Sequence, residues 1–325
     1  MTIQRRQLLK MTLGALAVPA FCGIASGQTY PTRPVRVIVG YAAGGASDIA
    51  ARLVGQRLSE RLGQSFVVEN RPGAASNLAT ETVVNAPADG HTLLLVSASN
   101  AINATLYEKL NYNFIRDITP VGSITRGPLV MLVNPSLPVQ TVSEFIAYAK
   151  ANPDKVNMAS AGVGSPQHLA GELFCAMAGI KMLHVPYRGA PPALTDLIGG
   201  QVQTYFGSTA GAISYVRSGQ LRALAVTSAK PSEALPDIPT IGEAVPGYEA
   251  TTWYGLGAPK GTSAAVIEKL NAEINAALGD PTIKARMAEL GGTAFPGSPA
   301  DFARLIADET ERWGRAVKFS GVKEG

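Results

Sequence analysis

Two loops of small residues are the segments of this sequence best suited to bind a ligand. The first covers residues 41–48 and reads Tyr-Ala-Ala-Gly-Gly-Ala-Ser-Asp, between an expected strand and an expected helix. Glycines let the backbone approach a ligand closely, and the first amides of a helix have no partner within it. Such a loop binds an anion, carboxylate as readily as phosphate. The alternative is a tight strand–helix turn capped by Gly45 or Ser47.

A second loop of the same design covers residues 160–168 and reads Ser-Ala-Gly-Val-Gly-Ser-Pro-Gln-His. Neither loop has the Gly-x-x-x-x-Gly-Lys of a phosphate-binding loop or the glycine spacing of a dinucleotide fingerprint. If the two loops face each other across a cleft, each can grip one carboxylate of a bridging ligand. The pair favours a binding protein more strongly than either loop alone.

Ser165 and His168 allow an alternative interpretation, a nucleophilic hydrolase. The Gly-x-Ser-x-Gly pattern fails because position 167 is glutamine, and a three-residue separation on a helix places a nucleophile and its base poorly. His91 and His184 add no metal-ligand spacing. The sequence therefore predicts no catalytic site, no metal and no cofactor.

Composition indicates a globular protein: 325 residues, of which 46% are hydrophobic and 16% charged. The formal net charge is +4, but Arg5, Arg6 and Lys10 stand in an N-terminal segment without acids. Without those three, the 28 basic residues become 25, against 24 acidic residues. Nucleic-acid binding needs a clustered basic face, which the rest of the chain lacks.

Residues 1–27 have the features of an export signal peptide: a basic start, an apolar stretch over residues 13–21, and small residues before Gln28. The adjacent Arg5 and Arg6 favour twin-arginine export, with an ordinary Sec signal as the alternative. Export of this type predicts a soluble periplasmic protein. Cys175 is then the sole cysteine, so no intramolecular disulfide is possible, and its apolar neighbours predict a buried helix position.

Strand and helix patterns alternate along the chain, which predicts an α/β architecture with largely parallel sheets. Expected strands are 35–39, 66–68, 93–96, 129–133, 156–160, 182–185, 202–206 and 221–226. Expected helices are 49–62, 141–150, 168–178, 193–198, 213–217, 264–278, 282–290 and 299–318. Residues 125–128 and 230–249 look like crossings between two lobes. We therefore expect one lobe of residues 28–128 plus 250–325 and a second of residues 129–249.

Beyond the two loops, several motifs occur in an order that resembles the Bug family, the periplasmic receptors of tripartite tricarboxylate transporters. The resemblance runs from about Tyr30 to the C-terminus, and no single motif would be specific. Its carriers are residues 30–35, 44–48 with Arg52, 68–74, 85–93, 160–168, 185–189, 221–227 and 235–240. One departure is that many relatives have proline where this chain has Ala42 or Ala43.

The resemblance implies a type II periplasmic-binding (Venus flytrap) fold with two lobes around a ligand cleft. It implies a receptor, not an enzyme, that acts as a monomer, captures a small carboxylate and delivers it to membrane transporter subunits. The ligand-binding residues expected on these grounds are Tyr41, Gly44, Gly45, Ala46, Ser47, Asp48, Ser97, Asn100, Gly162, Gly164, Ser165, His168, Tyr187 and Thr209.

Three other functions stay open on sequence grounds. They are a periplasmic serine hydrolase using Ser165 and His168, the effector domain of a transcription regulator, and a partner that presents ligand to a sensor kinase. The predicted export signal and the lack of an N-terminal helix-turn-helix count against the regulator. Ligand identity is also open, from dicarboxylates and tricarboxylates to aromatic acids and amino acids.

Overall fold

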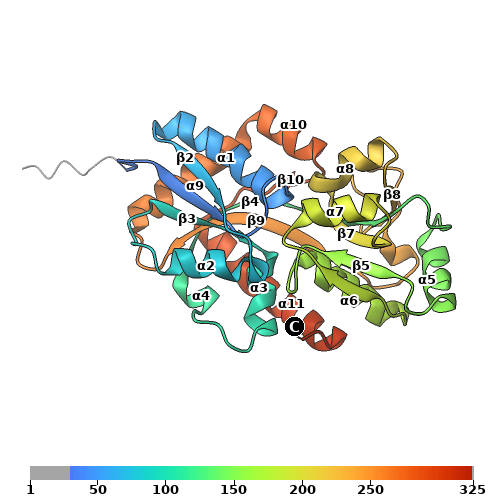
Figure 1. Cartoon of the computed structure of the whole chain (residues 1–325). Coiled ribbons are helices and arrows are strands. Elements are labelled where there is room, and N and C mark those ends of the chain that lie inside the picture. The colour runs from blue at the N-terminus through green and yellow to red at the C-terminus, as the bar shows by residue number, and fades with distance from the viewer. Residues whose placement is uncertain (1–29, 324–325) are drawn as a thin grey trace, which may run out of the picture. The chain divides into compact units, whose positions relative to one another are not determined.

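The computed structural model describes residues 30–323, in which helices and strands alternate (Figure 1). The predicted signal peptide lies outside these described residues. The strands are β1 (Val35–Val39), β2 (Phe66–Asn70), β3 (Thr92–Ser97), β4 (Ile118–Val133), β5 (Asn157–Ser160), β6 (Leu183–Pro186), β7 (Thr204–Ser208), β8 (Arg222–Val226), β9 (Thr251–Pro259) and β10 (Thr293–Ala294). The helices are α1 (Ala46–Leu62), α2 (Asn77–Val84), α3 (Ala98–Leu106), α4 (Phe114–Asp117), α5 (Val142–Ala151), α6 (Pro166–Ala178), α7 (Ala190–Ile198), α8 (Thr209–Arg217), α9 (Ala264–Gly279), α10 (Pro281–Glu289) and α11 (Pro299–Ser320).

Local sequence rules account for the ends of many of these helices. Gly63 ends α1 in the left-handed conformation, with φ of 71°, and its amide donates to the Ser59 carbonyl at 3.0 Å. The Thr141 hydroxyl caps α5 by accepting from the Glu144 amide at 3.1 Å. Ser298 caps α11 in the same way. The expected helix limits are therefore confirmed at these positions.

The strands form two groups joined through β4. We call the first group the first subsheet: β2, β1, β3 and β9, with β10 and residues 118–128 of β4. The second subsheet contains β7, β5, β6 and β8 with residues 129–133 of β4. Pairing is parallel among β1, β2 and β3 and among β5, β6 and β7, whereas β4 and β9 pair antiparallel. The sheet is mixed, so the expectation of largely parallel sheets holds only away from β4 and β9.

Residues 125–128 do not form a separate connection but lie inside β4. β4 pairs with β9 through Pro128 and then changes its partners to β7 and β8 at Leu129 and Val130 (Figure 1). Register shifts after Pro120 and Ser123 let the strand bend without ending. The expected strand over residues 129–133 is too short, because glycine and proline usually mark strand ends and here they do not.

Thr227 fixes this transition from inside the protein. Its hydroxyl accepts from the Leu129 amide at 2.7 Å and lies 2.6 Å from the Ala250 carbonyl. Its backbone amide donates to the Leu129 carbonyl at 2.9 Å, and its carbonyl accepts from the Ala250 amide at 2.9 Å. The side chain is fully buried. One threonine thus holds β4 beside the segment that leads into β9.

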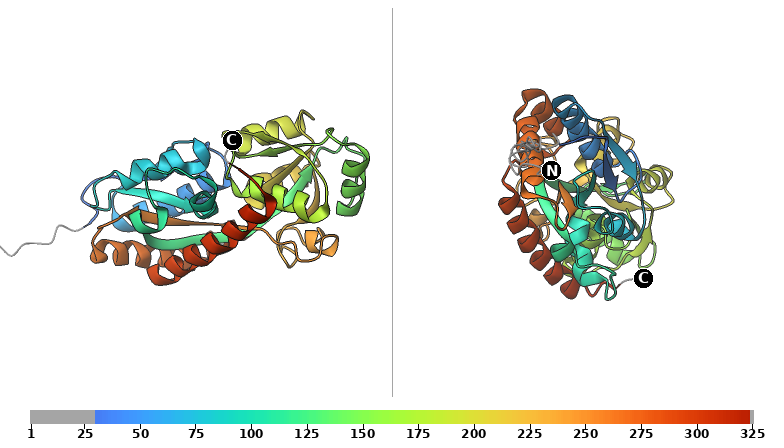
Figure 2. Two further views of the ribbon diagram at one scale, coloured as in Figure 1. Left: turned by 90° about the horizontal axis from the view of Figure 1, so that it is seen from below. Right: turned by 90° about the vertical axis from the view of Figure 1, so that its left-hand side faces the viewer.

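Helix α11 packs against elements of both subsheets. Figure 2 shows it as a long helix that runs past α3 and α6, and it contacts both of them as well as β4. Trp253 of β9 stacks edge-on against Phe302 of α11 and donates from its indole to Glu309 at 3.0 Å. By its contacts, the chain from Pro31 on forms one compact unit, and the assignment of residues to two lobes stays a prediction.

Candidate ligand-binding site

A small polar cavity lies where loops and helix starts from both subsheets meet. Its volume is about 20 Å³. The lining residues are Tyr41, Gly45, Ala46, Ser47, Ser97, Ser99, Ala161, Pro166, Gln167, Ala190, Ser208 and Tyr254. None of these residue types carries a formal charge at neutral pH. A cavity of this size has room for about one water molecule.

The first turns or capping residues of five helices contribute to this wall. They belong to α1, α3, α6, α7 and α8. Gly45 and Gly189, which precede α1 and α7, have no side chain to cap the helix, and the Ser208 hydroxyl makes no capping hydrogen bond to α8. In α6, by contrast, the Ser165 hydroxyl accepts from the His168 amide at 3.2 Å. Each helix start carries a partial positive charge of about half an elementary charge. The cavity therefore offers positive potential without a lysine or arginine. Its amide donors come mainly from α1, α3 and α8, because Pro166 of α6 and Pro191 and Pro192 of α7 have no N–H group.

Two buried polar atoms of the lining have no hydrogen-bond partner. They are the Ser97 hydroxyl and the Gln167 side-chain carbonyl, on residues that are 3% and 7% exposed. An unsatisfied buried polar group costs about 1–3 kcal/mol. The Ser97 hydroxyl can donate to an anion, and the Gln167 amide can do so after a half-turn that exchanges its oxygen and nitrogen. A bound ligand would satisfy both groups.

Two tyrosines complete the lining as neutral donors. The Tyr41 hydroxyl is hydrogen-bonded to the Ser99 hydroxyl, and burial raises the pKa of Tyr41. Burial likewise raises the pKa of Tyr254 to about 12. Both phenols stay protonated at physiological pH, so neither repels a carboxylate.

The first loop is braced within itself. The Gly44 amide donates to the Asp48 carboxylate at 2.9 Å, and Arg52 donates to the same carboxylate at 3.0 Å. Burial alone would raise the pKa of Asp48, but the hydrogen bonds from Arg52 and Gly44 outweigh it and hold the pKa below its usual value. Gly44 and Asp48 therefore shape the loop, while Gly45, Ala46 and Ser47 line the cavity.

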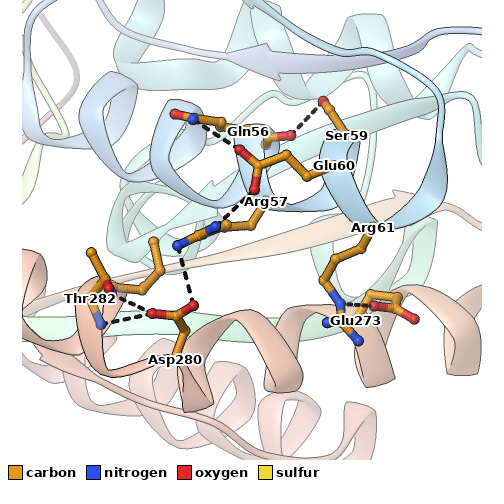
Figure 3. Close-up of polar contacts among 10 residues, drawn as sticks. Gln56, Arg57, Ser59, Glu60, Arg61, Glu273, Asp280 and Thr282 are labelled. Atoms are coloured by element: carbon orange, nitrogen blue, oxygen red, sulfur yellow. Dashed lines mark hydrogen bonds and ion pairs between the residues drawn. The ribbon is translucent and has the colours of Figure 1, made fainter.

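Charged contacts at the far end of α1 hold the helix in place (Figure 3). Arg57 donates to Glu60 at 2.8 Å and to Asp280 before α10 at 3.2 Å. Arg61 is hydrogen-bonded to Glu273 of α9. These contacts fix the C-terminal end of α1 against α9 and α10, and its N-terminus is thereby held toward the cavity.

The second loop is held by a histidine. The Gly164 amide donates to Nδ1 of His168 at 3.3 Å, so this amide faces the imidazole. A Cβ on Gly164 would overlap the side-chain oxygen of Asn103 on α3, and its φ of +86° favours glycine. From this side the cavity is lined by Ala161, Pro166 and Gln167, whereas Gly162 and Gly164 form the turn outside the lining.

Ser165 and His168 do not form a nucleophile–base pair. The Ser165 hydroxyl caps the helix, and Nε2 of His168 lies 3.7 Å from Glu172. The His168 ring instead stacks on His184, with centroids 3.8 Å apart, and His184 contacts the Ser160 hydroxyl at 2.6 Å. Burial and the neighbouring His168 lower the pKa of His184 to about 3. The hydrolase interpretation is wrong in this geometry.

The remaining predicted residues lie at different distances from the cavity. Ser97 lines it, and Asn100 positions Ser97 by accepting from its amide at 2.9 Å. Tyr187 is turned away, because its hydroxyl donates to Asp196 at 2.6 Å. Thr209 lines an adjoining cavity and donates to the Pro128 carbonyl at 3.3 Å.

Six lining residues are additional to the individually predicted ones. Ala161, Pro166 and Gln167 belong to the predicted second loop, Ser99 and Ser208 are next to the predicted Asn100 and Thr209, and Ala190 follows the motif at residues 185–189. Tyr254 is a seventh and lies on β9, a strand that the sequence patterns did not predict. The signal for the first six was present, since each follows a strand and precedes or begins a helix. No periodic pattern in the sequence marks Tyr254.

Loops from the two sides of the cavity also contact each other directly. A Cβ on Gly189 would lie 2.9 Å from the Cβ of Ala42, so the loop before α7 rests on the first loop. The Tyr107 hydroxyl, after α3, donates to the Val163 carbonyl of the second loop at 3.3 Å. Both contacts join loops that follow strands of different subsheets, so they hold the two sides of the cavity together in this arrangement.

The sequence is similar to those of a known protein family. Residues 50–322 match the family described as the tripartite tricarboxylate transporter family receptor. The chain belongs to this receptor family. The match spans most of the chain and includes most of α1, the second loop and every strand from β2 on.

Individual relatives of the receptor agree with this assignment. Protein BugT from Bordetella pertussis is 37% identical over 310 residues, covering 94% of this chain and 95% of BugT. The solved structure of R. palustris Rpa4515 with adipate has a TM-score of 0.88 at 38% identity and covers 90% of this chain and 99% of that one. MatC from Rhodopseudomonas palustris with bound malate has a TM-score of 0.85 at 33% identity and covers 89% of this chain and 100% of that one.

The family assignment confirms two expectations from the sequence. The receptor has the periplasmic-binding-protein fold of its relatives, and it is a solute-binding receptor and not an enzyme. Among residues 30–323, no helix is long and apolar enough to cross a membrane. No group of three or more potential metal ligands occurs in that part of the chain.

Proposed function

We propose that this protein captures a small carboxylate in the polar cavity, in the periplasm, and delivers it to a tripartite tricarboxylate-type membrane transporter. The observation that carries the proposal is the convergence of five helix starts on one uncharged cavity. Helix N-termini attract anions, and their unpaired amides hydrogen-bond them. The adipate and malate in the two similar structures are both carboxylates.

The energetics support an anion site without a cation. A hydrogen bond to a charged group contributes about 1.5–3 kcal/mol. The Ser97 hydroxyl and two or three helix amides around one carboxylate, less the cost of association, are enough for micromolar affinity, about −8 kcal/mol. A ligand that hydrogen-bonds to Ser97 and Gln167 also removes the cost of leaving these two buried groups without partners, which makes its binding free energy more favourable.

The size of the cavity requires an opening motion. A volume of about 20 Å³ is too small for adipate or malate, so the ligand enters when the two subsheets move apart. The chain offers a hinge at Leu129, where β4 changes partners, and at Ala250, which directly precedes β9; both residues are hydrogen-bonded to Thr227. The two lobes would then be residues 28–128 plus 250–325 and residues 129–249. A bound ligand that contacts both lobes would shift the population toward the arrangement described here.

A matched acid and amide panel tests the carboxylate requirement. The protein from Gln28 on would be unfolded, dialysed and refolded to remove copurified ligand, and then titrated calorimetrically with adipate, malate, citrate and benzoate. Adipamide and benzamide serve as neutral controls of nearly equal shape. We expect at least one acid to bind with micromolar affinity. Of adipate and benzoate, the acid that binds should bind at least 100-fold more tightly than its own amide. Equal binding of acid and amide would contradict it.

The export route is tested separately, in cells. Exchange of Arg5 and Arg6 for lysine keeps the charge and removes the arginine pair that twin-arginine export requires. We expect the precursor to accumulate in the cytoplasmic fraction. Unchanged recovery in the periplasmic fraction would favour the Sec route, and recovery of the wild type in the cytoplasm would contradict periplasmic capture.

A further inference from the structure

We propose that the captured carboxylate carries an apolar tail, and that the tail lies in a second cavity beside the polar one. The inference rests on the proposed carboxylate receptor and names its ligand class: monocarboxylates with an unbranched aliphatic tail, in preference to tricarboxylates.

The second cavity lies between α1, α10, the start of α8 and the crossing strands β4 and β9, and its volume is about 50 Å³. Its apolar side chains include Ile49 and Leu53 on α1 with Met287 and Leu290 around the end of α10. Ile49, Leu53 and Leu290 are only half-buried. They present apolar surface that a ligand can remove from water.

The two cavities adjoin each other. Ala46, Ser208 and Tyr254 line both of them. Ala46 and Ser208 have among the smallest side chains, so little material separates the two spaces at these positions. A ligand whose carboxylate lies at the helix starts can therefore extend past Ala46 toward Leu53.

The exposed wall of the second cavity is apolar, although Thr125, Arg126, Thr209 and Thr252 belong to its lining. The Thr125 hydroxyl donates to the Thr293 carbonyl at 2.9 Å, and Thr209 donates to Pro128. The guanidinium of Arg126 lies over the Phe295 ring, 4.8 Å from its centroid. A second carboxylate placed in this cavity would lose its hydration and would gain an ion pair only if Arg126 left the Phe295 ring, which is unfavourable. The geometry thus disfavours citrate and favours hydrocarbon.

The position of the apolar side chains explains why the tail would contribute to affinity. Each methylene that moves from water into an apolar site raises affinity by about fourfold. Ile49 and Leu53 are one helical turn apart on α1 and so present one continuous apolar strip. The same helix whose start binds the carboxylate thereby also contacts the tail.

Calorimetric titration with a chain-length series tests the inference. The probes are acetate, butyrate, hexanoate, adipate and citrate, added to the refolded protein from Gln28 on. We expect hexanoate to bind at least 20-fold more tightly than acetate and more tightly than citrate. Ala50→Leu places a larger side chain in the apolar cavity but not in the polar one, because Ala50 lines only the former. It should weaken hexanoate binding at least tenfold and change acetate binding less than twofold.

Two further variants keep the result interpretable. Leu53→Gln makes the half-buried wall polar, preserves helix propensity and should flatten the dependence on chain length. Gln56→Ala, at an exposed position of the same helix, should leave the whole series unchanged. Equal affinity for acetate and hexanoate, tighter binding of citrate, or no effect of Ala50→Leu would overturn the inference while the receptor function stood. Failure of all five acids to bind would overturn the proposed function and this inference with it.

Discussion

The loops at residues 41–48 and 160–168 are both rich in glycine and alanine, but different interactions hold them. Asp48 braces the first through hydrogen bonds to Gly44 and Arg52, all within one strand–helix connection. His168 holds the second through Gly164, and a Cβ on Gly164 would overlap Asn103 of α3, the helix that follows β3 of the first subsheet. At Gly44 and Asp48 the first loop is therefore held by its own neighbours in the sequence, whereas at Gly164 the second loop packs against α3 on the other side of the cavity.

This difference shows that similar composition does not give similar roles in closure. At Gly44, a Cβ would have as its nearest neighbour the Pro191 side chain at 3.9 Å, an ordinary contact. Glycine is favoured at position 44 because φ there is +82°. At position 164 glycine is favoured both by a positive φ, +86°, and by the close packing against Asn103. We expect changes at Gly44 and Asp48 to affect folding stability and changes at Gly164 to affect ligand binding.

Alanine at the two glycines tests this division most strongly. Gly164→Ala should weaken carboxylate binding about 100-fold, because the overlap with Asn103 opposes the closed state and each 1.4 kcal/mol is a factor of ten. Gly44→Ala should change affinity less than threefold and lower the free energy of unfolding by about 1 kcal/mol through backbone strain. Calorimetry and urea unfolding measure the two quantities.

Gly179→Ala provides a control for strain alone, since Gly179 has φ of +63° and an added Cβ would meet no atom within 4 Å. It should behave like Gly44→Ala. Equal losses of affinity at Gly44 and Gly164 would contradict the division of roles.

Removal of the charge at Asp48 should have the next largest effect. Asp48→Asn weakens the bonds from Arg52 and Gly44 and should lower the free energy of unfolding by about 1–2 kcal/mol. Because the pKa of Asp48 is lowered, its stabilisation is present above about pH 4 and is lost as the pH falls further. The variant should differ from wild type in urea unfolding at pH 7 and converge with it at acid pH. Glu60→Gln, at an exposed position of α1, should cause a smaller loss.

His184 of β6, which contacts Ser160 and His168 of the second loop, should make folding stability depend on pH in a different range. The pKa of His184 is lowered to about 3, compared with about 6.5 in an unfolded chain. Unfolding therefore takes up a proton at His184 as the pH falls from about 6.5 toward 3, and the folded state loses stability there. His184→Gln should reduce this loss by up to one proton in the slope of stability against pH. An unchanged slope between pH 6 and 4 would show that His184 is not buried as a neutral base.

Cys175 offers the smallest expected effect. It lies in α6, behind the second loop, and burial raises the pKa of its thiol to about 12. We expect negligible reaction with a thiol-specific reagent at pH 8 in the wild type and in Gly164→Ala. Rapid reaction in Gly164→Ala alone would show that this variant unfolds α6, and its weak binding would then have another cause.

Sequence reasoning found the elements whose signals are local. Gly63, Thr141 and Ser298 mark helix limits by their own chemistry, and the two loops stand out because each places two glycines and a serine between a strand and a helix start. β9 escaped detection because Gly255 and Gly257 interrupt it. Their cause is tertiary: a Cβ on Gly255 would overlap Phe302 of α11, and one on Gly257 would lie 2.9 Å from Val96.

The sequence predicts a site made of two facing loops, but several residues that line the cavity lie outside these loops. Tyr254 and Ser208 reach the cavity only because β4 pairs with both β9 and β7, which brings together residues far apart in the sequence. Conversely, Tyr187 is near the second loop but bonds to Asp196. Pairing across the sheet decides these positions, and no local pattern encodes it.

The most direct test of the central claim, that helix starts bind the carboxylate, is a pair of substitutions at Ser208. This residue caps α8 and lines the cavity without a capping hydrogen bond. Ser208→Asp supplies a fixed carboxylate at a favourable capping position, and Ser208→Asn supplies the same shape without charge.

Binding of adipate and hexanoate to both refolded variants would be measured calorimetrically, with urea unfolding as the check on folding. We predict that Ser208→Asp loses at least 100-fold in affinity while it stays folded and that Ser208→Asn stays within tenfold of wild type. Equal affinity of the two variants for either acid would contradict the claim that this cavity is the anion site.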